Sequence, residues 1–366
     1  MTDETLARAV RAALARVVDP ELRRPITELD MVRDVQVIAG TATIDLRLTI
    51  VGCPAADTIE RDVREAASSV AGVTDVAVML GVMTSTERDA LTARLRGTRT
   101  MPFGPDTLTR IICVTSGKGG VGKSTVTANL AVSFARSGLA VGVIDADVFG
   151  FSIPGLLGIE SARPTRVGDL ILPPVAYDVK AISIGMFTDP GTAVSWRGPM
   201  LHRTMQQFVT DVYFGDLDVL LIDLPPGTGD VAISLGQLLP HAEVIVVTTP
   251  QAAAASVAER SALVARQTGQ TVVGVVETMA GIAQPDGTVL DVFGTGGGAT
   301  VAQRLGVPLL ASIPLSVAVR EGGDVGVPVV VSDPTDAGAV ALGSLASALQ
   351  QRGRGLAGRR LGVRVD

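Results

Sequence analysis

The sequence predicts an α/β protein with a mainly parallel sheet flanked by helices, preceded by a small α+β domain. From Leu108 onward, short apolar runs alternate with helical stretches, which is the pattern of a parallel sheet with crossover helices. Before that point, helical stretches of the chain alternate with strand-like runs. The chain has 366 residues, of which 47% are hydrophobic, so both parts can bury a core.

The N-terminal part of the chain, residues 1–82, is expected to be the small α+β domain. Its expected elements are a helix over 5–17, strands over 32–38 and 41–50, a helix over 55–70 and a strand over 73–80. Apolar and polar residues alternate from Thr43 to Ile50, as in a strand with one buried face. Residues 83–107 contain Pro102, Gly104 and Pro105 and are expected to form a helix fragment and a linker.

The remainder of the chain is expected to be a P-loop domain over residues 108–350, followed by a basic tail over 351–366. Its expected later strands are 140–145, 219–224, 243–249, 271–277 and 308–313, and a last helix is expected over 336–350. Ligands of such sheets bind beyond the carboxyl ends of the strands. The tail is expected to be solvated, because it lacks the bulky apolar residues of a membrane-surface helix.

The expectation of a P-loop comes from a complete phosphate-binding motif, G-x-x-x-x-G-K-[ST], between a strand-like run over 110–114 and a helical pattern over 124–136. Its glycines let backbone N–H groups converge on phosphate oxygens, Lys123 reaches the terminal phosphates, and the Ser124 hydroxyl ligates magnesium. The predicted nucleotide-binding residues are Gly117, Lys118, Gly119, Gly120, Val121, Gly122, Lys123, Ser124 and Thr125. The loop therefore predicts nucleotide binding, and Lys118 is a second lysine that a single site does not need.

Two further strands run into acidic residues. Asp223 ends an apolar run and is typical of a Walker B acid, which holds magnesium directly or through water. Asp145 and Asp147 follow another apolar run and precede a turn. One of this pair could orient the attacking water or its magnesium, a role that favours Asp147, or both could cap the turn.

Composition excludes several other classes of protein. The net charge of −6 and the 3% aromatic content argue against a general nucleic-acid binder. Two cysteines exclude a disulfide framework, no N-terminal signal pattern is present, and no apolar run is as long as a membrane span. A cytoplasmic protein without a membrane span is expected.

The larger domain resembles the Mrp/ApbC family of P-loop ATPases over residues 108–345. The blocks that carry this resemblance are residues 116–129, 145–150, 196–200, 222–230, 249–251, 293–298 and 313–315. The resemblance implies a homodimer that binds ATP and Mg²⁺ and carries iron–sulfur clusters to client apoproteins or assembly factors. It places Asp147 in switch I and Asp223 at the Walker B position, and implies that Lys118 reaches the nucleotide of the partner subunit, where its charge would stabilise phosphoryl transfer.

The N-terminal part resembles the small domains of iron–sulfur assembly factors. Residues 19–21 and 49–54 carry this resemblance, which makes Cys53 a candidate cluster contact. A position just before a helix favours its thiolate. A small buried core residue is the alternative for Cys53, whereas Cys113 lies inside a strand and is expected to be core.

One feature departs from the family. Cluster-carrying members have a C-x-x-C pair after the strand that ends near Glu277, and residues 277–287 of this chain contain no cysteine. Thr278 also stands where the family tends to have Asn near the adenine. Three interpretations follow: cluster handling with Cys53 and other ligands, assistance to assembly without a bound cluster, or a regulatory or positioning switch like the MinD and ParA proteins.

Overall fold

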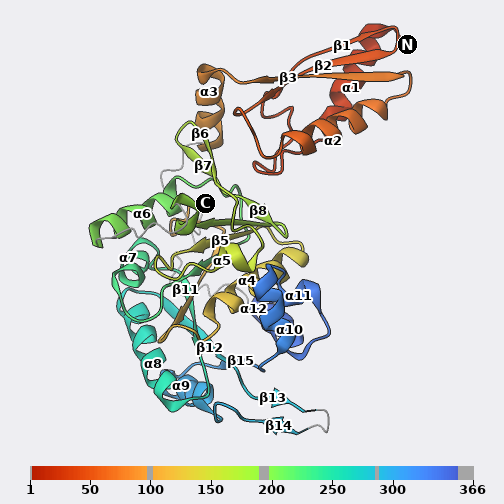
Figure 1. Cartoon of the computed structure of the whole chain (residues 1–366). Helices are drawn as coiled ribbons and strands as arrows, with labels where there is room; N and C mark the ends of the chain where they lie inside the picture. The colour runs from red at the N-terminus through yellow and green to blue at the C-terminus, as the bar shows by residue number, and fades with distance from the viewer. Residues whose placement is uncertain (1, 97–101, 189–197, 285–287, 353–366) are drawn as a thin grey trace, which may run out of the picture.

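The structure is a computed structural model that describes residues 2–96, 102–188, 198–284 and 288–352 (Figure 1). Residues 189–197, which include part of the block 196–200, and residues 285–287 lie outside the described ranges, as does the basic tail beyond Arg352. In the described part of the chain, no helix is long and apolar enough to cross a membrane.

The N-terminal domain is a small sheet with two helices packed on it. In the part of the chain that is described, its elements are α1 (Asp3–Leu14), β1 (Val32–Ile38), β2 (Thr41–Leu48), α2 (Ala56–Ser68) and β3 (Asp75–Val82). Strand β2 is central, antiparallel to β1 and parallel to β3. Every second residue of β2 is buried, because the helices cover one face only. All five elements were predicted from the sequence, with boundaries that differ by a few residues.

The connection to the larger domain contains more structure than a linker. Helix α3 (Ser85–Arg96) contributes Leu91 and Leu95 to the apolar core of the N-terminal domain. The same core includes residues from a short hairpin of the larger domain, β6 (Thr165–Val167) and β7 (Leu170–Leu172). Figure 1 shows α3 and this hairpin between the two domains. Residues 97–101 of the predicted linker lie outside the described residues.

The larger domain is built on a sheet that contains eight strands in the described ranges. In order across the sheet they are β15 (Leu309–Ile313), β12 (Thr271–Thr278), β11 (Glu243–Thr248), β4 (Arg110–Ser116), β10 (Val219–Asp223), β5 (Val141–Asp145), β9 (Val179–Ser183) and β8 (Val175–Ala176). All neighbours are parallel except β8 and β9. This confirms the predicted α/β fold with a mainly parallel sheet, and the strands that were predicted are found within two residues of their expected ends.

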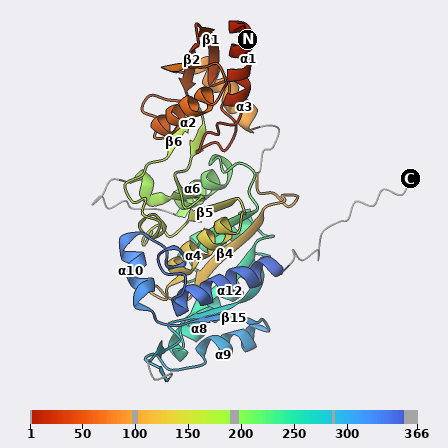
Figure 2. The ribbon, with the colours of Figure 1, turned by 90° about the vertical axis from the view of Figure 1, so that its right-hand side faces the viewer.

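Helices cover both faces of this sheet, and each face has its own apolar core. On one face lie α4 (Lys123–Arg136), α5 (Ile153–Leu156), α10 (Val317–Val325), α11 (Val329–Ser332) and α12 (Ala337–Gln351). On the other lie α6 (Gly198–Thr210), α7 (Asp230–Leu238), α8 (Ala252–Gln267) and α9 (Gly297–Leu305). Figure 2 shows the N-terminal domain stacked on this layered body.

Three smaller elements complete the described structure. A 3-10 helix, η1 (Ile184–Phe187), follows β9, and a short antiparallel hairpin is formed by β13 (Ile282–Ala283) and β14 (Val289–Leu290). The sequence analysis predicted none of the elements between β5 and β10. Strands β6, β7 and β8 are only two or three residues long, too short for alternation to be recognised in the sequence.

Candidate nucleotide site

The phosphate loop connects the carboxyl end of β4 to the N-terminus of α4. Gly120 and Gly122 have φ angles of +76° and +79°, in the left-handed region that favours glycine. Gly117 packs so closely on the backbone of α8 at Ala258 that a Cβ atom would overlap it. These glycines bring the loop around the N-terminus of α4, where unpaired N–H groups and the helix dipole attract phosphate.

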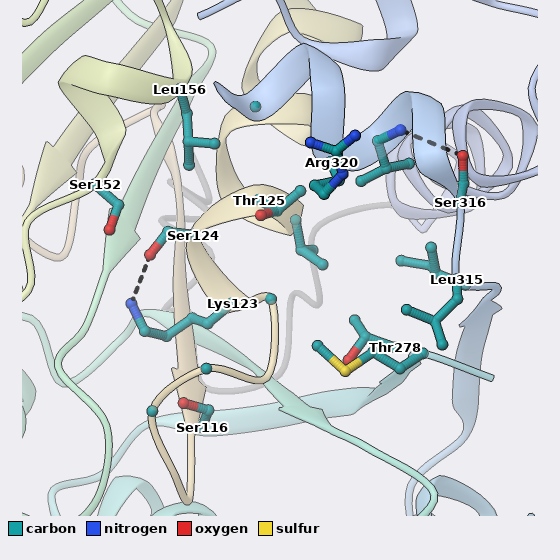
Figure 3. Close-up of a pocket in the computed structure, with 18 of the residues that line it drawn as sticks. Ser116, Lys123, Ser124, Thr125, Ser152, Leu156, Thr278, Leu315, Ser316 and Arg320 are labelled. Carbon is teal, nitrogen blue, oxygen red and sulfur yellow. Dashed lines mark hydrogen bonds between the residues drawn. The ribbon is translucent and has the colours of Figure 1, made fainter. Parts of the chain in front are cut away.

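Lys123 and Ser124, the first residues of α4, lie beside the acid at the end of β10. The Lys123 Nζ donates to Asp223 Oδ2 at 2.5 Å and lies 3.2 Å from Ser124 Oγ. Ser124 Oγ donates to the same oxygen of Asp223 at 2.6 Å. Figure 3 shows Lys123 and Ser124 turned toward each other beneath the cavity.

The other oxygen of Asp223 is also occupied. Its Oδ1 accepts a hydrogen bond from Thr127 Oγ1 at 2.7 Å, and the whole side chain is buried. Strand β10 lies between β4 and β5, so its carboxyl end is held next to the phosphate loop. A hydroxyl and a carboxylate are hard oxygen ligands, so Ser124 and Asp223 fit a magnesium ion. Sequence reasoning missed Thr127, although it follows Lys123 by one helical turn on the same face.

Asp145 and Asp147 differ in their surroundings. Asp145 is fully buried, and its Oδ2 accepts hydrogen bonds from the backbone of Ser152 and Ile153 and from Ser183 Oγ, all at 3.1–3.2 Å. Burial and the charge of Asp223 raise the pKa of Asp145 to about 7. Strand β5 ends at Asp145, so Asp147 lies beyond the strand.

Asp147 lines the cavity and lies 3.8 Å from the Lys123 Nζ. Its Oδ1 accepts from the backbone of Gly150 at 3.1 Å, and burial raises its pKa. Of the two acids, Asp145 shapes the turn and Asp147 is directed to the cavity. This arrangement agrees with the preference for Asp147 as the residue beside the attacking water.

Lys118, the additional lysine of the loop, is exposed and is among the residues that line the cavity. Its carbonyl oxygen accepts a hydrogen bond from Ser116 Oγ at 2.9 Å, which holds the backbone of the loop.

Thr278 lines the nucleotide cavity and also contacts the phosphate loop. Its Oγ1 lies 2.6 Å from the carbonyl oxygen of Val121 and 3.1 Å from that of Thr248. The hydroxyl therefore connects the end of β12 to the phosphate loop. Its neighbour Glu277 accepts from the backbone of Gly298 at 2.6 Å and fixes the start of α9. Sequence reasoning did not predict either contact.

A cavity of about 970 Å³ opens above the loop, within the size range of ligand pockets. One end is formed by the phosphate loop and Asp147, and the other by apolar residues after β12 and β15 together with α10. Thr278, Leu315 and Arg320 line the second end, opposite Lys123 (Figure 3). A polar end with N–H donors and a largely apolar end suit the phosphates and the base of a nucleotide.

The two cysteines lie apart from this site, and both are buried. Cys113 is inside β4, as predicted. Cys53 lies just before α2 and is buried, as in the core alternative, and burial together with the carboxylates of Glu21 and Asp19 raises the pKa of its thiol to about 11. Among the described residues, no group of three or more His, Cys, Asp or Glu side chains could hold a metal ion.

Two family models match the chain. Residues 107–350 match the model described as NUBPL iron-transfer P-loop NTPase, and residues 7–79 match the model described as iron-sulfur cluster assembly protein. The chain belongs to the iron-transfer P-loop NTPase family. The chain is similar to proteins named iron-sulfur cluster carrier protein from Mycobacterium tuberculosis, at 55% identity over 99% of the chain and 97% of the relative. It is also similar to a protein of the same name from Synechocystis, at 40% identity over 92% of the chain and 95% of the relative.

Solved structures of nucleotide-binding proteins share the fold of the larger domain. A nucleotide-binding protein from Archaeoglobus fulgidus in complex with ADP is 36% identical, with a TM-score of 0.53, and the match covers 59% of the chain and 86% of that protein. The septum site-determining protein MinD from Pyrococcus horikoshii, complexed with Mg-ADP, is 26% identical with a TM-score of 0.50. The match covers 66% of the chain and 96% of that protein. The near-complete match to cluster carriers favours their class over the MinD-like alternative.

Proposed function

We propose that this chain binds ATP with Mg²⁺, hydrolyses it as a homodimer, and uses that cycle in the assembly or transfer of iron–sulfur clusters. The observation that carries the proposal is the contact of Asp223 with both Lys123 and Ser124. It occurs in a chain whose relatives along almost its whole length are named iron-sulfur cluster carrier protein. The match of residues 7–79 to an iron–sulfur assembly domain supports the same cargo.

The residues of the cavity have different roles in nucleotide binding. The backbone N–H groups of the loop over residues 117–125 bind the phosphates, and Lys123 neutralises their charge. Ser124 and Asp223 would hold Mg²⁺, which, when bound, neutralises charge on the transferred phosphoryl group. Asp147 lies where it can orient a water molecule, since it lines the cavity within 3.8 Å of Lys123.

The role proposed for Lys118 requires a second subunit. Its side chain is exposed, and the residue lies at the edge of the nucleotide cavity. In a dimer that closes over the nucleotides, each Lys118 would reach the phosphates bound by the partner and stabilise the charge of the transition state. Hydrolysis should therefore be slow in the monomer and should depend on protein concentration.

The cluster is cargo, and the chain offers it few ligands. A cubane cluster is usually held by four cysteine thiolates, and this chain has two cysteines, both buried. The interpretation that fits best is a protein that promotes assembly or transfer while a client or an assembly partner supplies thiolates. Stable carriage by the isolated chain fits less well.

Anaerobic reconstitution tests the proposal. The purified chain is incubated with ferrous iron, sulfide and an apo-ferredoxin, with or without Mg-ATP, and cluster formation on the ferredoxin is followed by its visible absorption. We expect ATP to accelerate transfer and Asp223→Asn to remove that acceleration. Iron and sulfide counts on the re-isolated chain distinguish carriage from assistance, and transfer that is equally fast without the chain would contradict both.

A further inference from the structure

A fully buried lysine lies where the N-terminal domain meets the larger domain. Lys180, in β9, has its Nζ 5.2 Å from the centre of the Tyr213 ring, and among the described residues this Nζ has no hydrogen-bond partner. Only three of the 31 Lys and Arg residues are lysines, and the other two are in the phosphate loop. Burial, together with the nearby positive charge of Arg23, lowers the pKa of Lys180 to about 7.

Two buried acids of the N-terminal domain, Asp19 and Glu21, lie near enough to this lysine for their charges to interact with it. Burial raises the pKa of Asp19 and raises the pKa of Glu21 to about 7. The positive charge of Lys180 opposes this shift in both acids, but its effect is smaller than that of burial. Asp19 Oδ1 accepts hydrogen bonds from the backbone of Glu21 and Leu22 at 2.9 and 2.8 Å, which fixes the loop that presents Glu21. Acids from one domain and a lysine from the other are therefore buried together at the junction.

Glu21 joins the larger domain to the cysteine of the N-terminal domain. Its Oε1 accepts from Thr165 Oγ1 of β6 at 3.3 Å, and its Oε2 accepts from Cys53 Sγ at 3.8 Å. Cys53 is 5% exposed and belongs to the same apolar cluster as the β6–β7 hairpin and Tyr213. The thiol is thus held protonated and hidden beneath a junction to which both domains contribute.

Several of the polar contacts described around this junction involve a backbone carbonyl. Arg23 donates to the carbonyl of Asp178, and Thr92 of α3 donates to that of Val167 at 3.1 Å. Burial disfavours the charged forms of Asp19, Glu21 and Lys180, so the closed junction has an electrostatic cost that water would remove if the domains separated. Such an interface is suited to open and close.

Strand β9 connects this junction to the nucleotide site. Lys180 is three residues from Ser183, whose Oγ donates to Asp145 Oδ2 at 3.1 Å, and Ser183 is paired with Asp145 in the sheet. Asp145 in turn accepts from the backbone of Asp147, which lines the nucleotide cavity. Hydrogen bonds and strand pairing therefore link the turn after β5 to β9.

We propose that the junction of Asp19, Glu21, Cys53 and Lys180 is a reversible closure that hides the Cys53 thiol, and that β9 makes its opening depend on the bound nucleotide. When the domains separate, Cys53 becomes available to iron–sulfur chemistry. The inference rests on the proposed function only for the identity of the cargo, because closure itself can be measured without iron.

The test uses the full chain and its two cysteines. Maleimide labelling of each cysteine is followed by mass spectrometry, with Cys113, inside β4 and fully buried, as the reporter of global unfolding. Thr165→Glu places a second carboxylate against Glu21 and should accelerate labelling of Cys53 at least about tenfold without labelling Cys113. Thr300→Glu, the same change on the exposed face of α9, should leave both rates unchanged. Unchanged Cys53 labelling in Thr165→Glu would overturn the closure.

Two further measurements cover the case in which Thr165→Glu also exposes Cys113. The double variant Glu21→Gln/Lys180→Met removes opposite charges together, so it should stabilise the closed junction and slow Cys53 labelling. An equal or faster rate would contradict the electrostatic cost of closing the junction. In the wild type, Mg-ADP and a non-hydrolysable ATP analogue with Mg²⁺ should give Cys53 rates that differ at least about fivefold. Equal rates in the two nucleotide states would overturn the coupling through β9, whatever the outcome of the cluster-transfer assay.

Discussion

The Thr278 hydroxyl lies 2.6 Å from the carbonyl oxygen of Val121, so the end of β12 is tied to the phosphate loop. A hydroxyl has one proton, and the shorter distance indicates that it is given to Val121 rather than to Thr248 at 3.1 Å. The loop that must bind phosphate is therefore positioned in part by a strand two places away in the sheet.

Thr278→Val should loosen the phosphate loop while keeping the volume of the side chain. It leaves a buried carbonyl without its partner, so we expect the free energy of unfolding to fall by about 1–3 kcal/mol. Nucleotide affinity, measured by titration with a fluorescent ATP analogue, should weaken several-fold. Thr268→Val is the matched control, because that hydroxyl bonds carbonyls at the end of α8, away from the cavity. Equal nucleotide affinity in the two variants would contradict the positioning role of Thr278.

Asp223→Asn should separate nucleotide binding from its dependence on magnesium. The amide keeps the shape of the carboxylate but loses the charge that faces Ser124 and Lys123. We expect nucleotide binding in EDTA to persist, the gain in affinity on adding Mg²⁺ to disappear, and hydrolysis to fall at least about 100-fold. Asp218→Asn, at the other end of β10, is the control and should retain the magnesium effect. An undiminished magnesium effect in Asp223→Asn would rule out this acid as the metal ligand.

The two lysines of the loop should have separable effects. Lys123→Ala removes the buried ammonium beside Asp223 and should weaken nucleotide binding at least about tenfold. Lys118→Ala removes an exposed side chain, so we expect unchanged nucleotide affinity with the loss of ATP-dependent dimerisation and of hydrolysis. Sedimentation with and without an ATP analogue and a phosphate-release assay measure these effects. Intact dimerisation and hydrolysis in Lys118→Ala would exclude its action across the dimer.

Glu21 predicts a pH dependence of stability with a definite sign. Its pKa is raised from 4.5 to about 7 in the folded protein, so the folded state binds more protons than the unfolded state between these values. The contribution of Glu21 to stability is therefore present below pH 4.5 and is lost as the pH rises toward 7, by at most about 1.4 kcal/mol per pH unit. The difference in unfolding free energy between the wild type and Glu21→Gln, measured by urea denaturation from pH 5 to 7.5, should fall accordingly. A difference independent of pH would contradict the buried position of this carboxyl.

The fold class and the phosphate loop could be predicted from the sequence because both depend on local patterns. The loop motif sets its own backbone through glycines at Gly120 and Gly122, and buried parallel strands are continuous apolar runs. Asp223 was also predicted from a local pattern, because an apolar run that ends in an acid is typical of a Walker B acid in a chain with such a loop.

Contacts between segments that are distant in the sequence could not be predicted from such local patterns. Thr278 lies 157 residues from Val121, and Lys180 lies more than 150 residues from Glu21 and Asp19, so no periodicity relates them. Strands β6 to β8 are too short to show alternation, although the hairpin of β6 and β7 carries much of the contact between the domains. For Cys53, the sequence left a thiolate and a buried core residue as alternatives, and in the folded chain burial and two neighbouring carboxylates raise the pKa of its thiol.

The sequence by itself therefore determined that this chain has a nucleotide-binding loop, a Walker-type acid and a small N-terminal domain with a single cysteine. Those features follow from the types of residues and their spacing within short segments of the sequence. Tertiary structure alone decided which of Asp145 and Asp147 faces the cavity, where Thr278 points, and that Cys53 is hidden at a junction with Lys180. The physical reason is that burial and the charges brought close by folding set the state of these side chains, and neither is a property of a local segment.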